Sequence, residues 1–144
     1  MKKLLIAALA ALCLAGCASV PMADAAADAE AKKFVPPTDK AGVYIYRNTS
    51  FGGAIKMPVS IDGEQIGVTG ANVYLYKEID PGNHIVVSKA ENTESLVLDA
   101  EKGKLYYIWQ QVRMGAWKAR CSLVQKDEEE GQKGVMETKL GLTK

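Results

Sequence analysis

Cys17 is the residue whose chemistry can be inferred most directly from its position in the sequence. It follows Lys2-Lys3, an apolar run from Leu4 to Leu14, and the small pair Ala15-Gly16. A basic start followed by an apolar run too short to cross a bilayer as a helix is typical of an export signal. The run is therefore predicted to be an export signal, and it ends in small residues immediately before Cys17.

The order Leu14-Ala15-Gly16-Cys17 resembles the lipobox of bacterial lipoproteins. This resemblance implies that a diacylglycerol is attached to the Cys17 thiol, that residues 1–16 are cleaved as a signal peptide, and that the new amino terminus receives an N-acyl lipid. Ala18, rather than an aspartate, follows the cysteine. The resemblance therefore implies the bacterial outer membrane, on its periplasmic face, over the inner membrane.

Such an anchor would be effectively permanent, because burying acyl chains contributes about 0.8 kcal/mol per CH₂ and the modified cysteine carries two or three chains. The alternative is an ordinary signal peptide, cleaved after a later small residue among Ala25 to Ala31, with Cys17 as an incidental cysteine.

The rest of the sequence offers few residues for catalysis or metal binding. His84 is the only histidine, and it follows a Pro-Gly-Asn turn, where its ring can simply bond turn carbonyls. Cys121 shares its parity with Trp117 and Leu123, so we expect it to be buried rather than reactive. The chain lacks C-x-x-C, H-E-x-x-H, G-x-S-x-G and P-loop patterns. We therefore predict no catalytic residue, no metal site, and no cofactor other than the lipid at Cys17.

Four tyrosines could form a binding face, because they alternate with apolar residues on two predicted strands. They are Tyr44, Tyr46, Tyr74 and Tyr76. If the two strands are neighbours, the four rings line one face, and an exposed aromatic face could stack on sugar rings or on a protein partner. In the alternative that we favour, the C-terminal helix or a long loop covers this face.

The elements that position these residues are predicted from apolar and polar residues that alternate with a period of two. The expected strands are 41–47, 55–61, 65–68, 72–79, 84–89, 95–100, 104–113 and 117–124. Val43 and Ile45 should face the core, as should Ile85 and Val87. Asp62-Gly63 is the sequence of a hairpin turn. The acidic run from Asp127 to Glu130 suits the start of a short C-terminal helix.

Strands at this spacing, without long helical segments between them, favour an all-β fold. We predict an antiparallel β-sandwich, immunoglobulin-like or prealbumin-like, of about seven or eight strands. A small closed barrel is the main alternative. Residues 34–144 should form the domain. Residues 17–33, rich in Ala, Asp, Glu and Lys, should form a flexible tether with a reach of roughly 20–25 Å.

Charge argues against nucleic acid as a partner. Loss of the signal peptide removes two of the 18 basic residues. The remaining 16 basic residues and 17 acidic residues give a net charge of about −1. The chain therefore carries no basic excess for binding a phosphate backbone.

Five pieces of sequence occur in an order that is similar to one known family. They are Phe34-Val35-Pro36-Pro37, Val43 to Arg47, Val59 to Gly63 with Ile66-Gly67, Pro81 to His84, and Gly103 to Tyr107. Together they resemble the uncharacterised bacterial lipoprotein family that carries a DUF2846 domain, over roughly residues 34–124. The third and fourth pieces are also similar to PEGA-type domains, which are small β-sandwiches. Neither resemblance implies a catalytic residue.

The functional expectation is therefore a non-enzymatic lipoprotein, anchored in the outer membrane, that acts as an interaction or envelope-maintenance module with an envelope protein or peptidoglycan as its partner. The alternative is a peptidoglycan- or glycan-binding lipoprotein that uses the four tyrosines.

Overall fold

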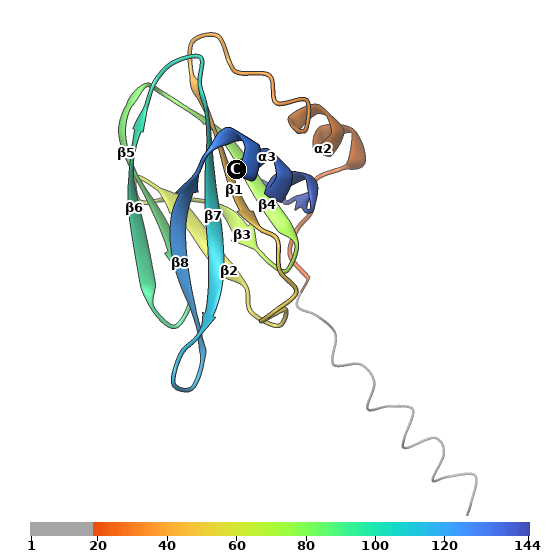
Figure 1. Ribbon diagram of the computed structural model, residues 1–144, viewed down its shortest axis with the longest axis vertical. Coiled ribbons are helices and arrows are strands. Elements are labelled where there is room, and N and C mark those ends of the chain that lie inside the picture. The colour runs from red at the N-terminus through yellow and green to blue at the C-terminus, as the bar shows by residue number, and fades with distance from the viewer. Residues whose placement is uncertain (1–18) are drawn as a thin grey trace, which may run out of the picture.

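The computed structural model describes residues 19–144, which form two β-sheets packed face to face with two short helices on one side (Figure 1). The elements are α2 (Ala25–Ala31), β1 (Ala41–Arg47), β2 (Met57–Ile61), β3 (Glu64–Thr69), β4 (Val73–Ile79), β5 (Gly82–Lys89), β6 (Thr93–Ala100), β7 (Leu105–Met114), β8 (Ala119–Lys126), α3 (Glu128–Met136) and β9 (Lys139–Leu140). The predicted all-β sandwich with a short C-terminal helix is confirmed. The predicted signal peptide and Cys17 lie outside the described residues.

The larger sheet has the strand order β8-β7-β1-β4-β9, and the smaller has the order β3-β2-β5-β6. Most neighbours run antiparallel, as predicted, but β1 pairs with β7 in parallel and so does β4 with β9. In both parallel pairs, the chain visits the other sheet before it returns beside the earlier strand. The larger sheet is therefore mixed, and the fold is a sandwich rather than a closed barrel.

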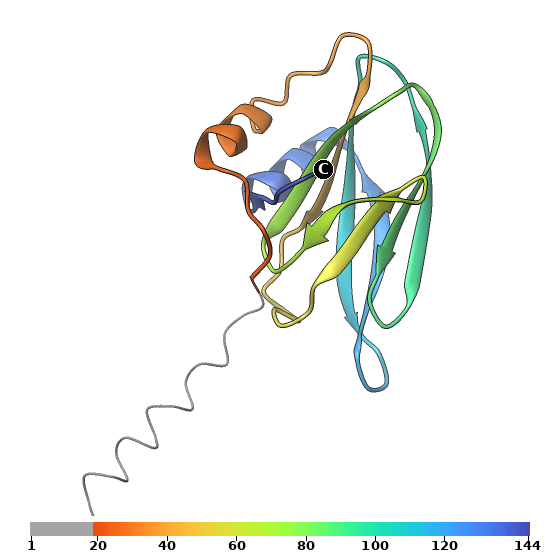
Figure 2. The same cartoon turned by 180° about the vertical axis from the view of Figure 1, so that it is seen from behind.

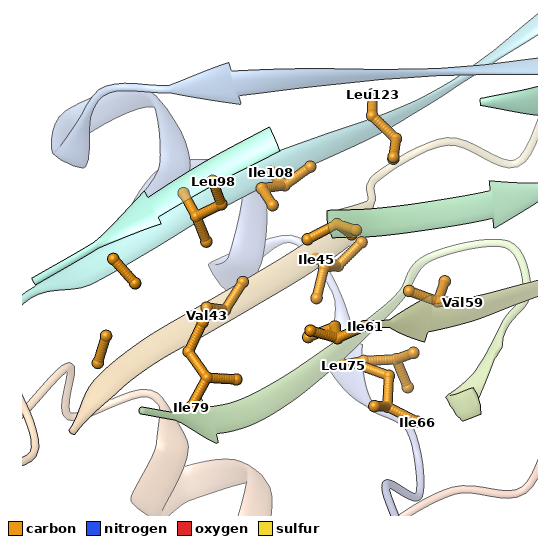
Figure 3. Packing of buried hydrophobic residues seen from close by; sticks show 13 residues of the cluster. Val43, Ile45, Val59, Ile61, Ile66, Leu75, Ile79, Leu98, Ile108 and Leu123 are labelled. Carbon is orange, nitrogen blue, oxygen red and sulfur yellow. The ribbon is translucent and has the colours of Figure 1, made fainter. Parts of the chain in front are cut away.

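The core lies between the two sheets and consists of aliphatic side chains (Figure 3). Val43 and Ile45 of β1 are fully buried there, opposite Val59 and Ile61 of β2. The period-two alternation predicted for β1 is confirmed, since its tyrosines occupy the other side of the sheet. Burial of this apolar surface is the main stabilisation of the sandwich.

The predicted inward face of β5 is wrong. Val86 is completely buried, whereas Ile85 is 50% exposed and pairs across the outer surface with Val97 of β6. The sequence from His84 to Lys89 has valines on both parities, so alternation alone did not decide the face. The inward face of β5 is set instead by its pairing with β2 and β6, which places Val86 and Ser88 between the sheets.

Helix α3 begins where the acidic run predicted a helix start. The Asp127 side chain caps it by accepting a hydrogen bond from the Glu130 backbone N–H at 2.9 Å. The first turn carries three glutamates, which interact favourably with the positive end of the helix dipole.

The segment before residue 34 is not a flexible tether, and this prediction is wrong for the described part. Val20 is buried, Met22 bridges to Gly141, and α2 packs over the larger sheet. The alanines of α2 give little apolar signal in the sequence, but they allow the helix to approach the sheet closely. The folded domain therefore begins at about Val20 rather than at Phe34 (Figure 2).

Candidate functional site

The four predicted tyrosines do come together, on the face of the larger sheet that points away from the sandwich core. Tyr44 pairs with Tyr76 across β1 and β4, and Tyr46 pairs with Tyr74. Tyr107 of β7 joins them, with its ring stacked on that of Tyr44 at 5.3 Å between centroids. These five residues are called the tyrosine layer below.

The tyrosine layer is covered, so it is not an open platform. Four of its five tyrosines are at most 3% exposed, and only Tyr76 is partly exposed. Helix α3 lies over β7 and β1, while α2 packs on the same face beside β9. The covered arrangement that we favoured from the sequence is the one observed, although α2 was not expected to contribute.

Two hydroxyl groups of the layer bond to α2, which helps to cover it. Tyr44 donates to the Ala31 carbonyl at 2.6 Å, and Tyr74 donates to the Asp28 carboxylate at 2.9 Å. Burial is the main cause that raises the pKa of every tyrosine in the layer, to about 12 for Tyr46 and for Tyr76. These hydroxyls therefore stay protonated at neutral pH, and those of Tyr44 and Tyr74 donate hydrogen bonds to α2.

Asp28 is the polar centre of the cover. Besides the Tyr74 hydroxyl, it accepts hydrogen bonds from Lys32 Nζ and from the Leu140 backbone N–H, both at 3.1 Å. Burial alone would raise the pKa of Asp28, but the hydrogen bonds from Tyr74 and Lys32 and the charge of Lys32 lower it below its ordinary value. One carboxylate thus ties α2 to β4 and to β9.

Two glycines let α3 lie directly on the rings. A Cβ atom at Gly131 would overlap the Tyr107 ring, and one at Gly134 would overlap the Tyr46 ring. From the sequence alone, each glycine is expected only to destabilise the helix by about 1 kcal/mol relative to alanine. The structure gives their reason, which is close packing of the helix backbone against the tyrosine layer.

His84 has no free ring nitrogen. Its Nδ1 lies 2.6 Å from Asp62 Oδ2, and its Nε2 lies 2.7 Å from the Asp80 carbonyl oxygen. Burial lowers the pKa of His84, but the hydrogen bonds to Asp62 and Asp80 outweigh it and raise the pKa above the ordinary value. The imidazole joins two turns, at Asp62 and at Asp80, which supports the structural role expected from the sequence.

Cys121 is buried, as predicted. It is 3% exposed, and its thiol donates to the Ser88 carbonyl at 3.5 Å. Burial raises the pKa of this thiol, so the nucleophilic thiolate is disfavoured. Within residues 19–144, no three metal-binding side chains gather in one place, and no helix has the length and apolar character needed to cross a bilayer.

One end of the sandwich has an open concave surface, where the loops 48–56, 90–92 and 115–118 meet. A groove of about 790 Å³ lies there, lined by Phe51, Met114 and Trp117 among others. Three exposed lysines, Lys56, Lys89 and Lys118, border the groove, against one glutamate, Glu91. These apolar residues and lysines are called the loop-end surface below.

Arg47 holds the loop that carries Phe51. Its guanidinium is fully buried and donates to the carbonyls of Ile55 and Gly52, both at 2.7 Å. None of the ion pairs found among residues 19–144 involves Arg47. Burial lowers its pKa, yet an arginine stays charged. A positive charge without a carboxylate partner therefore lies beneath the loop-end surface.

The loop-end surface was not predicted from the sequence, because Trp117 was expected on a strand with its side chain facing inward. Strand β8 begins only at Ala119, and Trp117 lies in the hairpin before it, 92% exposed. Gly115 closes this hairpin by donating its N–H to the Lys118 carbonyl at 2.8 Å. A glycine two residues before a tryptophan was the available signal for a turn that extends through Trp117.

Comparison with known proteins identifies the family. Residues 37–121 match the family model described as "Protein of unknown function (DUF2846)". A relative from Haemophilus influenzae, described as "Uncharacterized protein", is 36% identical over 135 residues, which cover 92% of this chain and 80% of the relative. No solved structure gives a significant match. The chain belongs to the DUF2846 family, as its ordered sequence pieces indicated.

Proposed function

We propose that this protein is a non-enzymatic lipoprotein, anchored by lipid at Cys17 in the bacterial outer membrane and facing the periplasm, where it acts as an interaction or envelope-maintenance module. One observation carries the proposal: a basic start, a short apolar run and the order Leu-Ala-Gly-Cys precede the folded part. The fold described from residue 19 onward is compatible with it, since Val20, the first buried residue of that part, comes three positions after Cys17.

The geometry of the reactive side chains supports a role other than catalysis. Both ring nitrogens of His84 are engaged in turns, and the hydroxyls of Tyr44 and Tyr74 bond to α2. A general base needs a nitrogen or oxygen free to reach a substrate proton. These groups instead stabilise the fold, which leaves the surface as the part of the domain that can act.

The test of the anchor is replacement of the thiol in the full chain. Wild type should carry two or three acyl chains by mass spectrometry and should fractionate with the outer membrane, whereas Cys17→Ser should lose both properties. Globomycin, which blocks the lipoprotein signal peptidase, should cause the uncleaved chain to accumulate. Cys13→Ser is the matched control, because it removes a thiol only four positions away. A Cys17→Ser protein that keeps its mass and its membrane fractionation contradicts the proposal.

The test of the interaction role is chemical cross-linking in intact envelopes, followed by identification of the proteins bound. Sedimentation with purified peptidoglycan tests a glycan partner separately. The soluble chain used for this should begin at Ser19, because removal of residues 19–33 would uncover the tyrosine layer. Specific capture of one envelope protein would support the role, and a chain without any specific partner in the envelope would contradict it.

A further inference from the structure

The loop-end surface has the composition of a membrane-contacting surface. Trp117 is 92% exposed, Met114 is 73% exposed and Phe51 is 51% exposed, so three large apolar side chains project from two loops and the adjoining end of β7. Tryptophan is enriched where membranes meet water, since its indole has an apolar body and a polar N–H. The lysines beside these residues can pair with anionic headgroups.

The described chain begins close to the loops that carry this surface. Val20 and Asn72 line one small hollow, and the Asn72 side chain donates to Ser50 Oγ at 3.1 Å, directly before Phe51. In both views of the molecule, the described chain begins in the half that also contains the β7–β8 hairpin (Figures 1 and 2).

The distance from the anchor to the fold is short. Val20 is three positions after Cys17, and a chain spans at most 3.3–3.6 Å per residue, so about 10 Å separates their Cα atoms at full extension. The predicted tether would have held the domain roughly 20–25 Å away. A lipid at Cys17 therefore leaves the domain no room to stand clear of the headgroups.

We propose that the loop-end surface seats the domain on the lipid bilayer, with Trp117, Met114 and Phe51 in the headgroup region and the lysines on anionic phosphates. This inference rests on the proposed lipid anchor at Cys17. Charge favours the same orientation, because the acidic residues of the first turn of α3 follow Lys126, at the opposite end of β8 from the hairpin. A bilayer is the occupant that the short anchor brings to this surface.

The test uses the two tryptophans of the chain as reporters. Lipidated full-length protein is reconstituted in vesicles of phosphatidylethanolamine and phosphatidylglycerol that are brominated in the upper acyl chain, where bromine quenches nearby indoles. Trp109→Phe leaves Trp117 as the only indole, and Trp117→Phe leaves Trp109, whose ring lies under Lys126 at 5.2 Å on the larger sheet. The Trp117 emission should lose most of its intensity, and the Trp109 emission should stay nearly constant.

Each outcome decides between the two proposals. Protein that sediments with vesicles and carries the lipid mass, but whose Trp117 is not quenched, overturns the seating while the anchor stands. Equal quenching of both indoles overturns it too, because the domain then has no preferred face. Protein without lipid mass overturns the anchor and the seating with it. In a second measurement, the wild-type hairpin should resist protease on vesicles, and Trp117→Ser with Met114→Ser should make it cleavable. Val97→Ser, which alters a valine on β6 that is 70% exposed, should leave the hairpin protected.

Discussion

The tyrosine layer and the loop-end surface both gather large apolar side chains, but they differ in what their neighbours do. In the tyrosine layer, a carboxylate, a backbone carbonyl and two glycines fit around the rings, and the layer is closed. At the loop end, Trp117 and Met114 are mostly exposed and project from a hairpin. Aromatic residues in a sequence therefore do not indicate a binding face by themselves. Whether such a face is open or closed depends on the small residues and hydrogen-bond acceptors that pack over it.

The largest effect should come from a change inside the tyrosine layer. Tyr44→Ser removes a ring that is 1% exposed and contacts four other rings. By analogy with other large-to-small core substitutions, it should lower the free energy of unfolding by about 3–5 kcal/mol, as measured by urea denaturation. Phe51→Ser at the loop end is the matched control and should change it little. Equal effects of the two substitutions would remove the distinction between the regions.

The next effect concerns the cover alone. Asp28→Ala removes the acceptor of Tyr74, Lys32 and Leu140, which should cost about 1.5–3 kcal/mol, as for hydrogen bonds to a charged group. Limited proteolysis should then cut near α2. Glu30→Ala in the same helix is the control, since Lys33, an exposed residue, is the one partner that the Glu30 carboxylate has among residues 19–144. Protection of α2 in the Asp28→Ala variant would contradict a fixed cover.

The sign of the pH dependence follows from the lowered pKa of Asp28. The contribution of Asp28 to the free energy of unfolding is present above the ordinary aspartate pKa of 3.8 and is lost as the pH falls through the lower folded-state pKa. The stability difference between wild type and Asp28→Ala should therefore shrink in acid.

A smaller effect tests the closeness of the cover. Gly134→Ala should lower the free energy of unfolding by about 1–3 kcal/mol through overpacking against Tyr46. In an exposed helix, the same change would raise it by about 1 kcal/mol. Lys133→Ala, at the neighbouring exposed position, should stay within about 0.5 kcal/mol. A stabilised Gly134→Ala variant would show that α3 does not touch the layer, and the calorimetric melting temperature gives this sign directly.

The smallest effect should come from the loop end. Trp117→Ser combined with Met114→Ser should change the free energy of unfolding by less than about 0.5 kcal/mol, because both side chains are mostly in solvent. Thermal unfolding of the soluble chain measures this. A fall of several degrees in melting temperature would place Trp117 in a packed environment and would make the two regions alike.

Much of the fold could be predicted from the sequence because its information is local. The alternation of Val43 and Ile45 with tyrosines placed β1, and Asp62-Gly63 placed a turn whose two residues both have positive φ. Local pattern failed at β5, where valines occupy both parities. It also could not indicate the parallel pairing of β1 with β7, because that pairing joins residues far apart in the chain.

The candidate site was less predictable for the same physical reason. The pairing of the tyrosines followed from strand neighbours, but their cover depends on the Ala31 carbonyl and on an aspartate in a segment without large apolar residues. Neither group gives a hydrophobic signal. The exposure of Trp117 depends on where a hairpin ends, and boundaries of one or two residues decide it.

The two ends of the described chain bond to each other, because Ala23 donates to the Leu140 carbonyl and Leu142 donates to the Pro21 carbonyl. A chain is synthesised from its amino terminus, so α2 is made early but waits for residues 139–142 before it is fixed. Until those residues are made, the part of the tyrosine layer that lies under α2 is not stably covered. A chain that stops before residue 139 therefore exposes aromatic surface that is buried in the folded domain. Chaperones and proteases can bind such an exposed surface.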